Sequence, residues 1–158
     1  MPNLRLTVLL AIVFLAILFI SPALGANESK QISLSIYVDN GSTNALVVGY
    51  MDNPEGLPFL NASERIYEKD TGMLYDVTGS LVKPDGGSWN LKFPLKGYYD
   101  EYHVVFYIPG MVELKEMDCS QGLEFLASRY NNSLIINVQG FDVSNPEVAI
   151  SYQEPEKD

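Results

Sequence analysis

Short runs in which hydrophobic and polar residues alternate dominate the chain from residue 31 onward. Such a period of two is typical of a β-strand with one buried face. In the clearest run, Gln31–Asp39, the hydrophobic positions are Ile32, Leu34, Ile36 and Val38. Further runs, either alternating or continuously apolar, predict strands over Ala45–Met51, Glu64–Lys69, Leu74–Val82, Trp89–Leu95, Tyr102–Ile108, Met111–Met117, Ser133–Val138 and Glu147–Tyr152.

Turn-forming residues separate these runs. Asn40-Gly41 is a strong hairpin signal, with a loop that extends as far as Asn44 in the longer alternative. Pro84-Asp85-Gly86-Gly87 predicts a turn, and Gly79 predicts a bulge inside Leu74–Val82.

The run Leu123–Tyr130 fits either a helix or a strand. The next two residues, Asn131 and Asn132, tolerate left-handed backbone conformations and so favour a hairpin. We therefore interpret Leu123–Tyr130 as a strand that pairs with the run after it.

About nine short strands at a spacing of roughly 8–12 residues predict an all-β fold, an antiparallel β-sandwich with immunoglobulin-like features. The predicted domain covers residues 26–152, and a polar, acidic tail covers residues 153–158. The Cys–Trp–Cys pattern of true immunoglobulin domains is absent from the sequence.

Residues 1–25 have the features of a secretory signal. Arg5 precedes an apolar run, Leu6–Ile20, and Pro22 and small residues follow, which predicts cleavage between Gly25 and Ala26. The alternative is an uncleaved N-terminal anchor helix, because the run extended to Leu24 approaches the roughly 20 residues that span a bilayer. Both readings place the domain outside the cytoplasm, either secreted or tethered to the outer face of the cytoplasmic membrane.

Four Asn-X-Ser sequons follow the predicted signal. They make Asn27, Asn40, Asn61 and Asn131 candidate sites of N-glycosylation. Only about one sequon is expected by chance in such a segment, so the excess favours an extracytoplasmic glycoprotein. The alternative is that Asn and Ser occur together because both form turns.

Charge and rare residues narrow the function classes. The 158 residues include 20 Asp and Glu and 10 Lys and Arg, a net charge of −10. Such an acidic chain excludes nucleic-acid binding, which needs a basic surface. One Cys and one His exclude zinc ribbons, disulfide frameworks and Cys/His nucleophile pairs within the chain.

The layout resembles extracytoplasmic β-sandwich domains of unknown function in archaeal, especially methanogen, membrane proteins, some of which precede membrane-tethered winged-helix regulators. The residues that carry the resemblance are Gln31–Asp39 after the signal, Tyr102–Pro109, and the hairpin through Asn131 and Asn132. The resemblance covers roughly residues 30–152. It implies a sensor-like domain and assigns no role to any residue.

Two single residues are candidates for chemistry. His103 lies on the polar face of its predicted strand, where it would act as a general base or a metal ligand. No serine elbow or spaced carboxylate accompanies it, so a surface histidine is the better interpretation. Cys119, predicted in a loop, is either buried as a small hydrophobe or paired between chains, and its acidic neighbours disfavour the thiolate.

Two segments are candidates for ligand binding. Asp39–Asn44 resembles a calcium loop, but the twelfth position is Tyr50 rather than a carboxylate, so turn formation explains the loop better. A weaker calcium hypothesis pools Asp39, Asp52 and Asp70. The second segment combines aromatic rings and carboxylates, a composition that suits a glycan-binding surface. The same composition also suits the ordinary start of a strand, where tyrosine rings are buried and their hydroxyls reach water. Its residues are Tyr98, Tyr99, Asp100, Glu101 and Tyr102.

These observations predict a non-enzymatic extracytoplasmic binding or cell-surface interaction module without a cofactor or a bound metal. Its expected partner is a cell-envelope protein or a glycan, with edge strands as the contact surface. Membrane contact is expected only through the N-terminal segment, if that segment stays uncleaved. A carbohydrate- or calcium-binding accessory module is the alternative, and an extracytoplasmic hydrolase is a remote one.

Overall fold

The structure, a computed structural model, describes residues 30–60 and 65–155. The predicted signal or anchor, the candidate glycan sites Asn27 and Asn61, and the last three residues of the tail lie outside the described residues. The described part contains eleven strands and one short 3-10 helix, η1, but no α-helix. The elements are β1 (Gln31–Val38), β2 (Ala45–Met51), η1 (Pro54–Gly56), β3 (Ile66–Glu68), β4 (Met73–Thr78), β5 (Val82–Asp85), β6 (Ser88–Pro94), β7 (Tyr98–Pro109), β8 (Glu113–Cys119), β9 (Leu123–Tyr130), β10 (Ser133–Ser144) and β11 (Glu147–Gln153).

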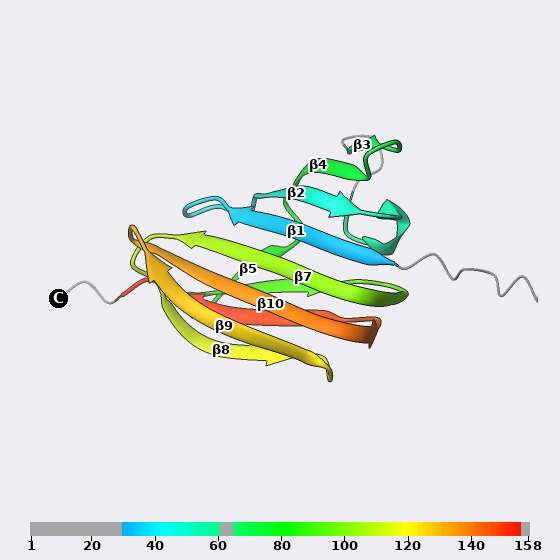
Figure 1. The fold of residues 1–158 in the computed structure, drawn as a ribbon. Helices are drawn as coiled ribbons and strands as arrows, with labels where there is room; N and C mark the ends of the chain where they lie inside the picture. Colours follow the sequence, from blue (N-terminus) through cyan, green and yellow to red (C-terminus); the bar gives the residue numbers. More distant parts are fainter. Residues whose placement is uncertain (1–29, 61–64, 156–158) are drawn as a thin grey trace, which may run out of the picture.

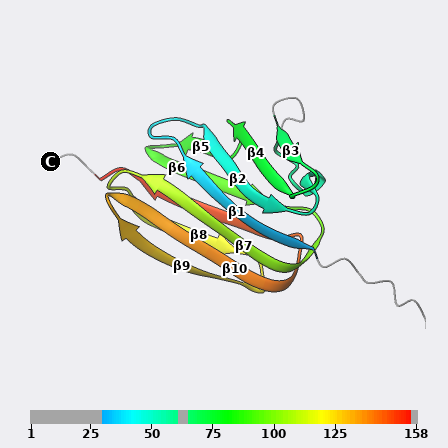
Figure 2. The same cartoon turned by 45° about the horizontal axis from the view of Figure 1, so that its top comes forward.

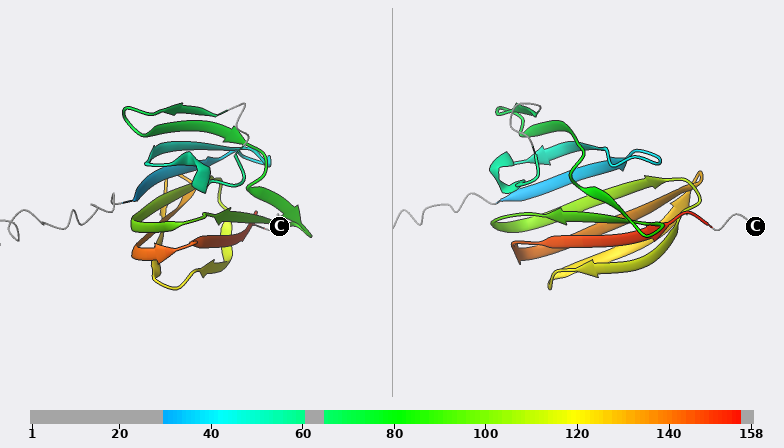
Figure 3. Two further views of the ribbon diagram at one scale, coloured as in Figure 1. Left: turned by 90° about the vertical axis from the view of Figure 1, so that its right-hand side faces the viewer. Right: turned by 180° about the vertical axis from the view of Figure 1, so that it is seen from behind.

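The strands form two sheets that pack face to face (Figure 1). The larger sheet has seven strands in the order β3-β4-β2-β1-β7-β10-β9, and the smaller has four in the order β5-β6-β11-β8. Figure 3 shows the two layers in two further views, one from the side and one from behind. The all-β prediction is confirmed, and the two sheets are consistent with a β-sandwich.

The sheets are not wholly antiparallel. Strands β1 and β7 pair in parallel, with Ser35 opposite Val105 and Tyr37 opposite Tyr107. This pairing joins two antiparallel halves of the large sheet. Local sequence carries no signal for it, because the two strands are about sixty residues apart.

The prediction of a single strand over Leu74–Val82 is wrong. Strand β4 ends at Thr78, and β5 begins at Val82 in the other sheet, so Gly79 lies at a crossing between the layers rather than at a bulge. The side chain of Leu81 enters the core in this crossing and is fully buried. The Ser80 hydroxyl anchors the crossing by donating to the Phe59 carbonyl at 3.1 Å.

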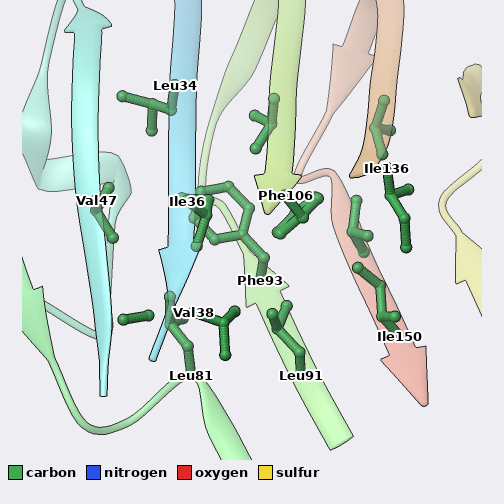
Figure 4. Packing of buried hydrophobic residues seen from close by; sticks show 14 of the residues in the cluster. Leu34, Ile36, Val38, Val47, Leu81, Leu91, Phe93, Phe106, Ile136 and Ile150 are labelled. Carbon is green, nitrogen blue, oxygen red and sulfur yellow. The ribbon is translucent and has the colours of Figure 1, made fainter. Parts of the chain in front are cut away.

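The core lies between the two sheets. Figure 4 shows Ile36, Phe106 and Ile136 of the large sheet facing Phe93 and Ile150 of the small one. The rings of Phe93 and Phe106 meet edge to face, with centroids 5.7 Å apart and planes at 83°. Full burial of each such side chain contributes about 1.5–3 kcal/mol to stability.

The interpretation of Leu123–Tyr130 as a strand is confirmed. Asn131 and Asn132 have φ angles of 47° and 59°, the left-handed conformation that a two-residue hairpin turn requires. The strand after the turn is longer than predicted and extends to Ser144. Cys119, predicted in a loop, is the last residue of β8.

The chain enters and leaves the described domain at opposite ends. Lys30 precedes β1, whereas the turns that contain Asn40 and Asn131 lie at the far end of the large sheet. Glu154, after β11, lines a small depression together with Asn40 and so lies at that far end too. Figures 1 and 2 show the C-terminal strand emerging on the side opposite the start of β1.

Candidate functional site

The predicted ligand-facing segment does not form one surface. Tyr98 and Glu101 are exposed, but the side chains of Tyr99 and Tyr102 are buried in the core. The hydroxyl of Tyr99 donates to the Lys96 carbonyl at 3.1 Å. The Asp100 carboxylate accepts a bond from the Lys30 backbone N–H at 2.6 Å and so fixes the start of β1. Two of the three rings are therefore not accessible to a glycan.

Tyr98 itself is engaged within the chain. Its hydroxyl donates to Oδ1 of Asp142 at 2.5 Å. This hydrogen bond, supported by burial and the charge of the carboxylate, raises the pKa of Tyr98 to about 12. The ring thus ties β7 to β10 at the end of the sheet.

His103 and Cys119 do not meet. The imidazole of His103 points outward from β7 between Ser33 and Gln139, and within the described part of the chain the ring has no hydrogen bond or ion pair. Cys119 is a half-buried free cysteine on the inner side of β8, packed against the core. Burial, and secondarily the charge of Asp118, raises the pKa of its thiol. The pair cannot act as nucleophile and base.

The calcium hypothesis that pools three aspartates is wrong. Asp39 follows β1, whereas Asp52 follows β2 and its backbone N–H bonds to Gln31 at the start of β1. The β1–β2 hairpin therefore separates Asp39 from Asp52 by its full length. In residues 30–60 and 65–155, no three His, Cys, Asp or Glu side chains are grouped so that they could hold a metal ion.

The two candidate glycan sites that the structure describes are both exposed. Asn40 and Asn131 lie in separate turns at the same end of the large sheet. A glycan on either residue would project from that end, away from Lys30.

A shallow groove of about 250 Å³ crosses the outer face of the four-stranded sheet. The small residues Ala149 and Ser151 form its floor, with Lys92 on one side and Glu116 and Asp118 on the other. The groove combines both charge signs, and Ser151 on its floor stands opposite Glu116 in register.

The outer face of the seven-stranded sheet is different, because hydrophobic side chains cross it from one side to the other. Two adjacent cross-strand rows form what we call the apolar belt. The first row runs through β4, β2, β1, β7 and β10, and the second through β3, β4, β2, β1, β7, β10 and β9. The belt residues are Val77, Leu46, Tyr37, Tyr107 and Ile135 in the first row, and Ile66, Tyr75, Val48, Val105 and Leu126 in the second. The polar residues Ser35 and Asn137 occupy the β1 and β10 positions of the second row and interrupt it.

The belt is open to solvent. Leu126 is 71% exposed, Ile66 68% and Val77 56%. The residues in the middle of the belt are half-buried, namely Val48, Val105, Tyr107 and Ile135. In the views of Figures 1 and 2, no described element crosses in front of β1, β7 and β10. Large contiguous apolar surfaces are rare on soluble monomers and mark interaction sites.

The middle of the belt is held by an aromatic pair. Tyr37 of β1 and Tyr107 of β7 stack with centroids 4.6 Å apart and ring planes 7° from parallel. They stand on neighbouring strands, so the stacked rings cover each other's faces and direct their edges away from the sheet. Such a pair offers an uneven apolar ridge rather than a flat stacking surface.

The border of the belt toward the start of β1 carries three glutamates. The next row toward the start of β1 contains Glu68 and Glu124, and Glu101 follows one row further. The seven strands contain a single Lys or Arg, Arg129. Its side chain lies on the opposite face of the sheet, with Leu134, and its guanidinium donates to the Val112 carbonyl.

The sequence indicates this apolar outer face through strands that are hydrophobic at nearly every position, a feature that the prediction of strands alone does not use. Val104–Ile108 and Ala45–Val48 are continuous apolar runs, in which the positions expected to be polar are hydrophobic as well. Such runs are typical of strands that are covered on both faces. The second face of this sheet has no cover among the described residues.

In comparisons with known proteins, no protein-family model, curated protein or solved structure matches this chain. The resemblance to archaeal extracytoplasmic domains therefore stays a prediction. In the part of the chain that the structure describes, no helix has the length and hydrophobicity needed to cross a membrane.

Proposed function

We propose that this chain is a non-enzymatic extracytoplasmic interaction module, secreted or tethered by its N-terminal segment, that binds a macromolecule of the cell envelope. The observation that carries the proposal is the apolar belt, an uncovered hydrophobic face ten residues in extent on a strongly acidic protein. A face of this kind favours association, because covering it removes apolar surface from water.

The predicted export signal and the four sequons support the extracytoplasmic part of this proposal. Kinship with immunoglobulin-like domains, which serve widely as recognition modules, is part of the same proposal. The two packed sheets support that kinship.

We do not propose a glycan site at Tyr98–Tyr102 or a calcium site at Asp39. Burial of Tyr99 and Tyr102 removes the stacking surface that the first requires. The separation of Asp39 from Asp52 along the hairpin removes the ligand set that the second requires.

Site-specific photo-crosslinking in the source cells tests the proposal. A photoreactive residue at Val77 or Leu126 probes the belt, and one at Lys83 or Lys92 probes the four-stranded sheet at exposed positions. We expect one discrete adduct from both belt positions and none from the two control positions. Adducts from the control positions alone, or from no position, would contradict the proposal.

A further inference from the structure

Resting on the proposed function, we infer that the apolar belt binds a protein whose own apolar surface is bordered by Lys and Arg, rather than a second copy of this chain. Three features of the belt and its surroundings carry this inference.

The first feature is the charge around the belt. Glu68, Glu101 and Glu124 are exposed on the outer face of the large sheet, where its seven strands present no Lys or Arg. Arg129 lies on the opposite face, and the nearest cations, Lys30 and Lys69, lie in the adjoining loops. The belt itself contains no charged residue. An interface core that is apolar, with a rim of one charge sign, is complementary to an apolar surface with a rim of the opposite sign.

The second feature is the size of the belt. A stable interface involves about 20–30 residues on each side, so the ten belt residues form only its core and the three glutamates must lie in its rim. In a symmetric pair of copies, the acidic rim of one copy would face the acidic rim of the other. Each copy also carries a net charge of −10, which opposes self-association further at low salt.

The third feature is the shape of the belt. The stacked Tyr37 and Tyr107 rings present edges, against which protein side chains can pack, and the face that each ring turns toward the other is closed to a sugar. An acidic rim also repels anionic lipid surfaces. Among the macromolecules of an envelope, a cationic protein surface fits these features best.

Two matched peptides provide the direct test. They share the same apolar positions of an amphipathic sequence but carry only Lys or only Glu at the polar positions, and fluorescence anisotropy measures their binding to the full chain. We expect the Lys peptide to bind at least about tenfold more tightly than the Glu peptide at low salt. Equal affinities would overturn the inference.

Charge variants separate the local rim from the overall charge. The variant Glu68→Gln/Glu101→Gln/Glu124→Gln removes the rim, and Glu116→Gln/Asp118→Asn/Glu147→Gln removes three exposed acids from the other sheet. We expect the rim variant to lose most of the Lys-peptide preference and the control variant to keep it. Equal loss in both variants would show that net charge alone attracts the peptide and would overturn the inference.

Belt variants establish where the peptide binds. Ile66→Thr/Val77→Thr/Leu126→Thr makes exposed belt side chains polar, and Met111→Thr/Phe125→Thr makes exposed apolar side chains elsewhere polar. The belt variant should weaken Lys-peptide binding about tenfold and the control variant little. Binding that both variants leave unchanged contradicts the inference. If the triple variant does not fold, Leu126→Thr and Val77→Thr alone provide the comparison.

Sedimentation equilibrium tests the rival occupant. A monomer at micromolar concentration is expected, and a dimer that the belt variant dissociates would overturn the inference while leaving the belt as an interaction site. Failure of the broader proposal is a separate result, since it requires that belt positions give no photo-crosslink in the cell.

Discussion

Neighbouring tyrosines of β7 have different environments because tertiary contacts, not sequence, decide what covers each ring. Tyr98 is exposed and bonded to Asp142, whereas the Tyr99 hydroxyl lies against Gly56 of η1 and the Tyr102 ring is buried in the core. Burial raises the pKa of Tyr102, with a smaller contribution from Cys119. A cluster of aromatic residues in sequence is thus divided between the core and the surface.

The Tyr98–Asp142 bond has a measurable consequence. Asp142→Asn removes the carboxylate charge but keeps an amide that tolerates the left-handed backbone at this position, where φ is 55°. We expect the pKa of Tyr98 to fall from about 12 toward its usual value near 10. A ¹³Cζ NMR titration measures this pKa, with Tyr152 as the internal control. Burial raises the pKa of Tyr152 to about 12, and the substitution should leave it there.

The same groups set an alkaline limit to stability. The pKa values of Tyr98 and Tyr152 are about 12 in the folded chain and about 10 in the unfolded chain. Their contribution to the free energy of unfolding is therefore fully present below pH 10 and is lost as the pH rises through 12. Urea unfolding between pH 8 and 12 should show stability falling in that window. A flat profile there would contradict this assignment.

Two phenylalanines test the position of the core. Phe93 is fully buried, whereas Phe141 is 69% exposed. Phe93→Ala should lower the free energy of unfolding by about 3–5 kcal/mol because it leaves a cavity between the sheets. Phe141→Ala should change it by less than about 1 kcal/mol. Urea unfolding followed by Trp89 fluorescence measures both, and similar losses would contradict the packing in Figure 4.

At the level of elements, alternation predicts strands well but does not show which sheet a strand joins. The buried positions of β1, β6, β7 and β11 agree with the predicted hydrophobic faces. The sequence predicts one strand over Leu74–Val82, with Gly79 as a bulge. The structure divides it between the two sheets, where each half buries its apolar residues in a shared core.

Strand β2 depends on a glycine for its close approach to β1. A Cβ atom on Gly49, which has a φ of 142°, would lie 2.3 Å from the Ser33 carbonyl oxygen. Gly49→Ala should therefore cost about 2–4 kcal/mol of stability, through both the clash and the backbone conformation. Gly86→Ala, at a φ of 57° in open space, is the matched control and should cost about 1 kcal/mol. Urea midpoints provide the comparison, and equal losses would exclude the steric contribution.

For the whole molecule, the two described sequon turns lie at the end opposite Lys30. If the N-terminal segment holds the domain at a membrane, this arrangement directs glycans on Asn40 and Asn131 away from the lipid surface. It also leaves the apolar belt on the side of the domain, between the membrane and the glycans.

Intact mass of the native protein checks this arrangement. We expect a chain that begins at Ala26 and carries glycan mass, with one glycan lost in each of the variants Asn40→Gln and Asn131→Gln. Asn90→Gln lies outside any sequon and should leave the glycan mass unchanged. A full-length chain confined to washed membranes would show that the segment is an anchor. The absence of glycan mass would contradict the modification.

The sequence by itself determined the strand content, the buried face of most strands and the Asn131-Asn132 turn. These features depend on alternation and turn chemistry, which act between residues close in the chain. Only the tertiary structure decided the parallel β1–β7 pair, the crossing at Gly79 and the apolar belt. The belt joins residues between 37 and 135, and its rows exist only once seven strands are aligned in register, because register depends on contacts between distant segments.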